Sequence, residues 1–171
     1  MGYLSKLTIA ALLSALSAPS AMAQTQTDFP ERQFGMWSVY GYKGTCWMLA
    51  RKGVNGTILN FSMRTNGRKL LVGVENRSWT WLKNPGNYTA ELELGAASGT
   101  VNVVTRIDDS LGPLLATFLE GNSFALLRNT GRAALTLDGK RMFDIPLGEK
   151  DAAVDYLEEC ARTLGSGPYS G

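Results

Sequence analysis

The sequence predicts a mainly β domain: an antiparallel β-sandwich or a curved half-barrel with a C-terminal amphipathic helix packed on it. Short segments alternate apolar and polar side chains, which is the period of a half-buried strand. Turn dipeptides such as Asn66-Gly67 and Asp138-Gly139 separate several of these segments and favour tight hairpins between them. Only the last segment, which ends near Leu164, changes to the spacing of an amphipathic helix.

The N-terminus is typical of a bacterial export signal. Lys6 provides a positive charge, residues 7–16 are apolar, and Ala21-Met22-Ala23 is a cleavage motif. The apolar run is shorter than the ~20 residues that a membrane span needs, and no later run is longer. We therefore expect a periplasmic or secreted protein without a membrane span. Its expected parts are a signal peptide at 1–23, a flexible leader at 24–33, a single β-rich domain at 34–165 and a disordered tail at 166–171.

The expected strands follow the apolar alternation and the turns between them. The segment 46–51 is apolar on both sides, which favours a central strand, and the segment 88–94 alternates most cleanly, with residues 95–99 as the turn that follows it. One short helix is expected near 121–129, with Asn122 or Ser123 as its N-cap; a strand is the alternative for this segment. In chain order the expected strands are 34–42, 46–51, 58–65, 69–76, 88–94, 100–107, 114–119, 133–137 and 141–145.

The closing helix carries one of the two cysteines of the chain. Its apolar stripe, which must face the sheet, is formed by Ala153, Leu157, Cys160, Ala161 and Leu164. The other cysteine, Cys46, lies in an expected strand. Two cysteines in an exported chain usually form a disulfide because the compartment is oxidising, so we predict the bond Cys46–Cys160. A free, reactive thiol is the alternative.

The composition excludes several kinds of chemistry. The chain has no histidine, which excludes Ser-His-Asp and Cys-His catalysis and removes the commonest zinc ligand. It also lacks a phosphate-binding loop and a dinucleotide-binding motif. With 17 basic and 15 acidic residues, a net charge of +2, it has no electrostatic preference for nucleic acid. We expect a protein without enzyme activity, metal or cofactor, and without a nucleic acid partner.

Two acidic pairs have structural interpretations. Asp108-Asp109 opens an expected turn, where aspartate is common. Glu158-Glu159 lies on the closing helix as a solvated face, and Glu158 is four residues before Arg162, at the spacing of a helical ion pair. The alternative, a histidine-free hydrolase, needs such groups to converge in one pocket.

Two surface regions are candidates for binding. A group of basic residues gathers around the Asn66-Gly67 hairpin and would meet an anionic glycan or an acidic protein patch; as an alternative, it is a solvated hairpin tip. Two tryptophans project to one side of a short extended piece and would form an aromatic platform for sugars or a peptide; as an alternative, they pack in the core. The candidate binding residues are Arg64, Arg68, Lys69, Arg77, Trp79 and Trp81.

Four Asn-x-Ser/Thr motifs also occur, which would carry glycans in a eukaryotic secretory protein. Since the export signal suits a bacterium, we interpret them as products of turn composition. The four asparagines are Asn55, Asn60, Asn76 and Asn87.

Several residues together resemble a known protein family. A Phe34-Gly35-x-Trp37 strand follows the export signal, a strand with Cys46 comes next, and the chain closes as FDIPLGEKDAAVDYLEEC, from Phe143 to Cys160. This order is similar to small exported α-proteobacterial proteins of the invasion-associated locus B type. The resemblance implies a periplasmic or secreted β-rich protein that is not an enzyme, with a role at the cell envelope or in contact with a host.

These observations lead to one main functional hypothesis and two alternatives, of which the first is the histidine-free hydrolase described above. The main hypothesis is an exported, non-enzymatic binding module, either associated with the envelope or secreted, whose partner is an envelope or host protein or a glycan. The second alternative is a secreted inhibitor or a host-interaction factor that acts through the basic hairpin between Arg64 and Arg77.

Overall fold

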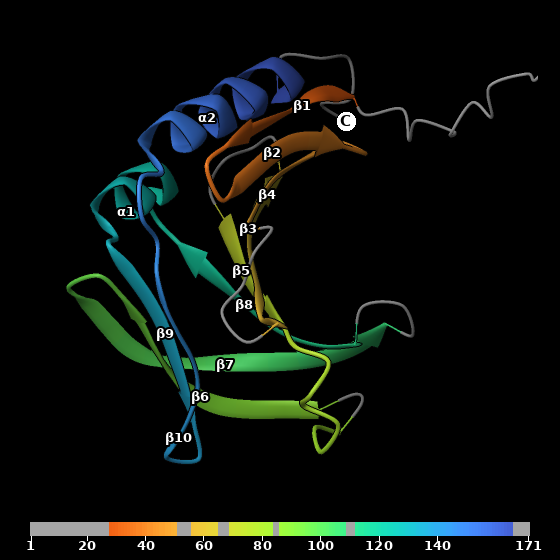
Figure 1. Cartoon of the computed structure of the whole chain (residues 1–171), viewed down its shortest axis with the longest axis vertical. Coiled ribbons are helices and arrows are strands. Elements are labelled where there is room, and N and C mark those ends of the chain that lie inside the picture. Colours follow the sequence, from red (N-terminus) through yellow and green to blue (C-terminus); the bar gives the residue numbers. More distant parts are fainter. Residues whose placement is uncertain (1–27, 51–55, 65–68, 84–85, 109–111, 166–171) are drawn as a thin grey trace, which may run out of the picture.

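The computed structural model describes residues 28–50, 56–64, 69–83, 86–108 and 112–165. Within them, one antiparallel sheet of ten strands curves into a half-barrel, and the C-terminal helix packs on it (Figure 1). The predicted fold class is confirmed, as a half-barrel rather than a sandwich. The strands lie in the order β1-β2-β3-β4-β5-β8-β7-β6-β9-β10.

The secondary structure follows the predicted segments closely. The strands are β1 (Phe29–Phe34), β2 (Trp37–Tyr42), β3 (Thr45–Ala50), β4 (Ile58–Arg64), β5 (Lys69–Glu75), β6 (Gly86–Leu94), β7 (Ala97–Asp108), β8 (Gly112–Glu120), β9 (Arg132–Leu137) and β10 (Lys140–Pro146). The helices are α1 (Ser123–Asn129) and α2 (Asp151–Gly165). The Asn122 side chain accepts a hydrogen bond from the Ala125 N–H and so forms the N-cap of α1. No helix of the described residues is long and apolar enough to cross a membrane.

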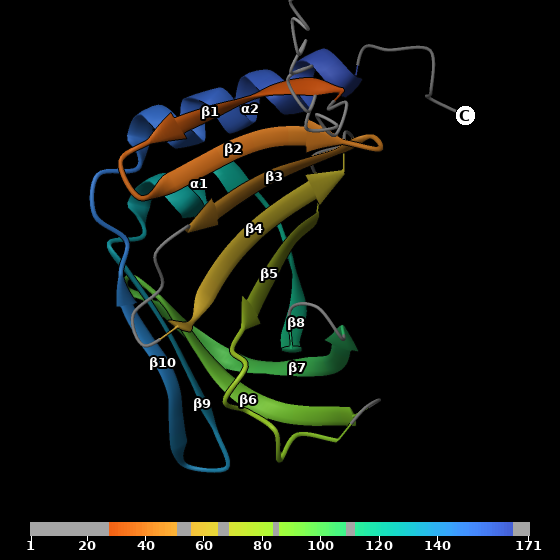
Figure 2. The ribbon, with the colours of Figure 1, turned by 45° about the vertical axis from the view of Figure 1, so that its right-hand side comes forward.

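The flexible leader predicted at 24–33 is wrong from Phe29 onward, because β1 forms there and pairs with β2. Figure 2 shows this strand running along α2. The Phe29 and Tyr156 rings lie 4.8 Å apart, and the Tyr156 hydroxyl donates to the Pro30 carbonyl at 3.0 Å. Most side chains of β1 are exposed, so the segment lacks a strong apolar alternation. The predicted signal peptide and tail lie outside the described residues.

The core fills the concave side of the sheet. Along β3, Cys46, Met48 and Ala50 are fully buried while the residues between them are half-buried, as the period of two requires. The Trp37 indole is also fully buried, and its Nε1 donates to the Leu147 carbonyl at 3.0 Å. That bond joins the first strands to the segment after β10, at the opposite end of the sheet.

Helix α2 closes the half-barrel and is held by the predicted disulfide. Its buried side packs on β1, β2 and β3, and Cys160 is joined to Cys46 of β3, with the two Cα atoms 6.0 Å apart. Both cysteines are fully buried. The thiols are therefore consumed by a structural bond and are not available as nucleophiles or ligands.

Gly41 lies directly beneath this disulfide, and its replacement by alanine is expected to destabilise the fold. A Cβ at Gly41 would lie 2.6 Å from the Phe29 Cβ and 3.1 Å from the Cys160 Sγ. Overpacking of this kind costs about 1–3 kcal/mol. Gly99 is the matched control, because it also lies in a strand and a Cβ there meets nothing within 4 Å. Urea denaturation of Gly41→Ala and Gly99→Ala measures the difference; equal stability of the two variants would contradict the close packing.

Candidate functional site

A solvent-open apolar pocket lies where β7 separates from β8. The two strands pair only from Val104 and Ala116 to Asp108 and Gly112. Beyond that point β7 continues towards Ala97 beside β6, whereas β8 continues to Glu120 beside β5. The diverging strands leave a gap, which we call the β7–β8 fork, with a cavity of about 250 Å³ inside it.

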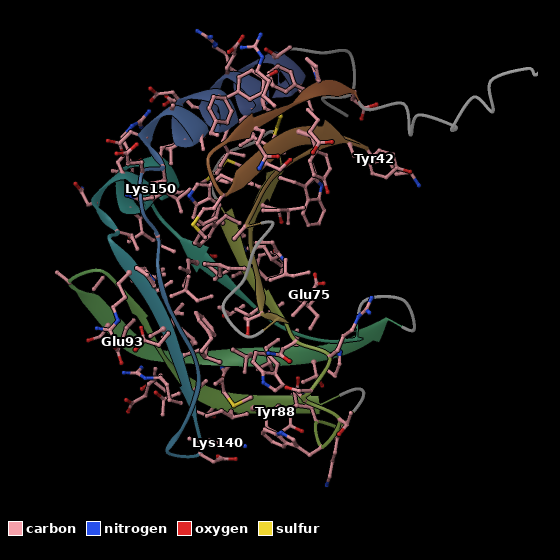
Figure 3. All side chains as sticks on the ribbon, in the orientation of Figure 1. Tyr42, Glu75, Tyr88, Glu93, Lys140 and Lys150 are labelled. Atoms are coloured by element: carbon pink, nitrogen blue, oxygen red, sulfur yellow. A yellow bond between two sulfur atoms is a disulfide. The ribbon has the colours of Figure 1, made fainter. Side chains whose placement is uncertain are left out.

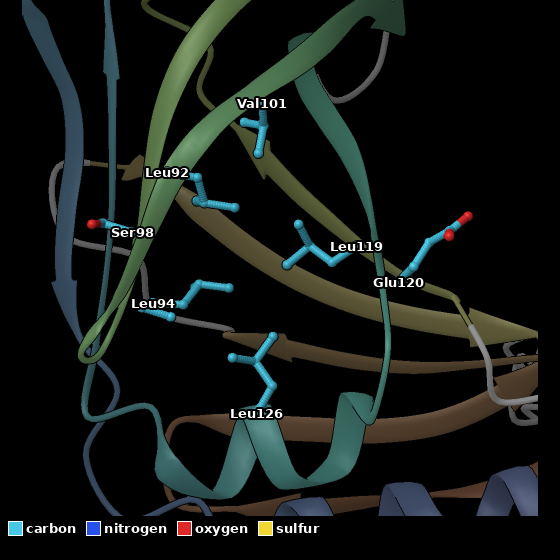
Figure 4. Close-up of a pocket in the computed structure, with 9 residues that line it drawn as sticks. Leu92, Leu94, Ser98, Val101, Leu119, Glu120 and Leu126 are labelled. Atoms are coloured by element: carbon cyan, nitrogen blue, oxygen red, sulfur yellow. The ribbon is translucent and has the colours of Figure 1, made fainter.

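The walls of this cavity are apolar. Figure 4 shows leucine and valine side chains from three strands and one helix pointing towards the same space, while the Glu120 and Ser98 side chains point away from it. The cavity is lined by Leu92, Leu94, Ala97, Ser98, Gly99, Val101, Leu119, Glu120 and Leu126. An enclosed cavity of about 150 Å³ with such walls binds benzene, so this open pocket of about 250 Å³ has room for an apolar group.

Helix α1 and the β6–β7 turn border the end of the fork that lies away from the Val104–Ala116 pair. The turn consists of Gly95 and Ala96 alone, so the longer turn predicted at 95–99 is wrong. The Gly95 N–H donates to the Arg132 carbonyl at 2.8 Å. A Cβ at Gly95 would lie 3.0 Å from the Asn129 carbonyl oxygen. The β6–β7 turn therefore packs so closely against the C-terminal end of α1 that a side chain at position 95 would crowd the Asn129 carbonyl.

The basic residues proposed to bind an anionic partner do not form one cluster. Lys69 begins β5, and its Nζ lies 2.9 Å from a carboxylate oxygen of Glu120. This hydrogen bond and the lysine's charge lower the pKa of Glu120. Arg77 follows the opposite end of β5 and is exposed. The Arg64 side chain, Arg68 and the Asn66-Gly67 turn lie outside the part that the structure describes.

The two tryptophans do not form a platform either. The segment after β5 is a series of turns, in which the Leu82 N–H donates to the Trp79 carbonyl at 3.1 Å, so the predicted extended piece is wrong. Trp79 is buried in the core, whereas Trp81 is 47% exposed. The Nζ of Lys140 lies 5.2 Å from the centre of the Trp81 ring. Lys140 is the first residue of β10, at the end of the β9–β10 hairpin (Figure 3).

Several charged side chains that the structure describes form ion pairs at the surface. Arg128 of α1 contacts both Asp155 and Glu158 of α2 at 2.7 Å, and their hydrogen bonds raise its pKa. Glu158 therefore contacts α1, a partner that helical spacing did not suggest. No group of three or more His, Cys, Asp or Glu in the described ranges could hold a metal ion. Asp109, of the other acidic pair, is outside those ranges.

Two of the four glycosylation motifs have a buried asparagine, Asn60 and Asn76. The Asn60 side chain is 2% exposed and covers Gly73 on the neighbouring strand. Asn76 is buried too, and its amide donates to the Thr57 hydroxyl at 2.8 Å. Burial of both side chains makes these two motifs inaccessible in the folded protein. Asn87 is exposed, and Asn55 is not among the described residues.

The pocket residues were found by the structure and not by sequence reasoning. Leu92, Val101 and Leu119 each belong to a predicted strand, where their apolar side chains are typical of ordinary core positions. One signal was present in the sequence: the stretch from Ala97 to Val103 has seven uncharged residues without proline. Residues 97–99 of that stretch fall within the predicted turn at 95–99, so the sequence pattern does not mark them as part of a strand.

Comparison with known proteins supports the fold. No protein-family model matches the chain, and no curated protein matches it in sequence. Among solved structures, the crystal structure of invasion associated protein B from Bartonella henselae is similar over 76% of this chain and 96% of that chain, with a TM-score of 0.54 and 14% sequence identity. At this identity the likeness concerns the fold, and it agrees with the resemblance that the sequence suggested.

Proposed function

We propose that this chain is an exported, non-enzymatic binding module, either associated with the cell envelope or secreted, and that the pocket in the β7–β8 fork is its binding site. The observation that carries the proposal is the apolar cavity of about 250 Å³, which opens to solvent between β7 and β8. Binding sites are typically concave and mostly apolar. An apolar group that enters the pocket removes the surfaces of Leu92, Val101 and Leu119 from water, which favours binding.

Three features support export. The N-terminal 23 residues have the pattern of a signal peptide. The buried disulfide Cys46–Cys160 suits an oxidising compartment. The fold resembles that of invasion associated protein B, which fits the family resemblance of the sequence. Cell fractionation of the full chain in a Gram-negative host tests export, with Gln24 as the expected N-terminus of the periplasmic or secreted form; an unprocessed cytoplasmic product would contradict it.

The absence of enzyme activity is supported by where the reactive groups lie. Among the described lining residues, Glu120 is the one with an ionisable side chain; it is paired with Lys69 at the surface and points out of the cavity (Figure 4). No acid and base among the described lining residues converge on a bound group. The pocket thus offers shape and apolar contact rather than proton transfer or nucleophilic attack.

A neutral, apolar fluorescent dye such as N-phenyl-1-naphthylamine tests the pocket, with two valines of β7 as a matched pair. Val101 lines the cavity, whereas Val104 is on the other face and 48% exposed. Val101→Glu is expected to weaken dye binding about tenfold or more, because a carboxylate in the pocket would lose hydration. Val104→Glu is expected to bind like the unchanged protein. Equal binding by both variants would show that the pocket is not the site.

A further inference from the structure

The β7–β8 fork exposes the backbone of β7 as well as an apolar floor. From Ala97 to Val103, β7 pairs with β6 on one side, and no described strand pairs with its other side. Several residues of this stretch, among them Ser98, Thr100 and Asn102, are exposed. The stretch therefore presents a strand edge to solvent inside the sheet, next to the pocket.

The β6–β7 turn determines which backbone groups point into the fork. Gly95 has a φ of 62° at the first of two turn positions, as in a type II′ hairpin. The residues that flank such a turn, Leu94 and Ala97, form a hydrogen-bonded pair, and bonded and non-bonded pairs alternate from there. The N–H and C=O groups of Ser98, Thr100 and Asn102 consequently point away from β6 and into the fork.

This edge lacks the protection that the two outer edges of the sheet carry. Edge strands usually avoid association through proline and charged side chains. The outer strand β1 contains Pro30, Glu31 and Arg32, and β10 contains Lys140, Arg141 and Pro146. The seven residues from Ala97 to Val103 contain neither a charge nor a proline. The edge inside the fork is thus the unprotected one.

We propose that the β7–β8 fork binds an extended peptide segment of a partner protein, which adds as a strand to the free edge of β7. The proposal rests on the proposed function of the pocket and names its ligand class. Alternating donors and acceptors along β7 are matched by another peptide backbone, whereas a purely apolar small molecule would leave them unpaired. The uncharged edge and the apolar floor favour an uncharged peptide.

The geometry also determines the side-chain pattern of the peptide. Gly99 and Val101 line the pocket, whereas Thr100 and Phe118 lie on the convex face of the sheet, where Phe118 is 62% exposed. Peptide residues opposite Gly99 and Val101 therefore place their side chains in the cavity, and those between them point to the convex face. Apolar residues are required at alternate positions.

A single extended segment fits the fork better than a second folded copy of this chain. On the far side of the gap stand β8, which is paired with β5 up to Glu120, and α1, which contributes Leu126 to the cavity. In a second copy, the same edge of β7 is flanked by its own β8 and α1. For two copies to pair through β7, the β8 strand and α1 helix of each copy would have to fit between them. An extended peptide brings no such elements and needs room only for its backbone and side chains.

The test uses capped seven-residue peptides that alternate valine with threonine, and calorimetry with the purified protein. One peptide is expected to bind per chain, and a peptide of the same composition with valines and threonines in two blocks is expected to bind at least about tenfold more weakly, because its valines cannot all enter the cavity. Thr100→Pro removes an N–H that points into the fork and leaves the bonds to β6 in place, so it is expected to weaken binding about tenfold. Thr100→Ala, which keeps this N–H, is expected to bind normally.

Binding of the neutral dye by Thr100→Pro checks that the variant is folded and its pocket intact. Should that variant fail to fold, peptides with single N-methyl groups replace it: binding is expected to fall when alternate backbone nitrogens are methylated. Four outcomes would each overturn the strand-addition proposal. Thr100→Pro could bind peptide as well as the unchanged protein does, or N-methylation could be tolerated at every position. Alternatively, every alternating peptide could fail to bind, or the protein could dimerise through this edge without peptide. If the protein binds the dye but no peptide, the peptide proposal is wrong while the pocket remains the proposed binding site. If it binds neither, the proposal that the pocket is a binding site is wrong as well.

Discussion

Removal of the Cys46–Cys160 disulfide is expected to lower the free energy of unfolding by about 4 kcal/mol. The two cysteines are 114 residues apart, and a cross-link that closes a loop of about 100 residues is worth up to about 4.7 kcal/mol through the unfolded chain. Both sulfur atoms are buried, so the double variant Cys46→Ala/Cys160→Ala also loses packing. Urea denaturation of the oxidised protein, the reduced protein and the double variant measures the effect.

The effect of the disulfide should also be local. The bond joins α2 to β3, and α2 otherwise packs on β1 and β2. In the reduced protein, amide hydrogen exchange is therefore expected to rise first in α2 and β1, before the strands at the other end of the sheet. Alkylation of the protein without reductant provides the control, because no thiol should react. Free thiols, or the same urea midpoint with and without reductant, would contradict the prediction.

Replacement of Trp37 by alanine is expected to cost about 4 kcal/mol of stability. The side chain is fully buried, its ring lies 5.9 Å from that of Phe61, and its Nε1 donates to the Leu147 carbonyl. Loss of a buried tryptophan costs about 3–5 kcal/mol. Trp37→Phe is expected to cost about 1–3 kcal/mol less than Trp37→Ala, because phenylalanine retains much of the apolar contact. It still destabilises the fold, because the Leu147 carbonyl loses its hydrogen-bond donor.

Trp81 is the matched control for this substitution. It is 47% exposed, so Trp81→Ala is expected to cost less than about 1 kcal/mol, part of it from the contact with Lys140. Chemical denaturation of the three variants provides the comparison. Similar losses for Trp37→Ala and Trp81→Ala would show that the bond across the ends of the sheet does not hold the half-barrel together.

Much of the fold could be predicted from local patterns. The strands on either side of Asp138-Gly139 form the predicted hairpin, with φ values of 50° and 73° at these two residues, because only a few residue types tolerate that turn. Asn122 was one of two candidate caps for α1 and is the one that accepts the capping bond. The strand β1 was missed because Phe29 is buried by Tyr156 of α2, a residue more than a hundred positions away.

The candidate site was largely beyond sequence reasoning. Lys69 and Arg77 are near each other in sequence, but Lys69 begins the seven-residue strand β5 and Arg77 follows its other end, at a rise of about 3.3 Å per residue. Trp79 and Trp81 differ in burial because turns replace an extended segment. The pocket depends on Leu92, Val101 and Leu119 approaching from three strands, which no local period indicates.

By itself, the sequence determined the β-rich class, most strand and helix positions, and the cysteine pair, because apolar periods and turn chemistry act over a few residues. Only the tertiary structure decided that β5 pairs with β8, that β7 leaves β8 beyond Val104, and that an apolar cavity fills the resulting fork. The order of strands in a sheet depends on pairing between residues far apart in the chain. The length over which two paired strands stay together depends on how the whole sheet curves.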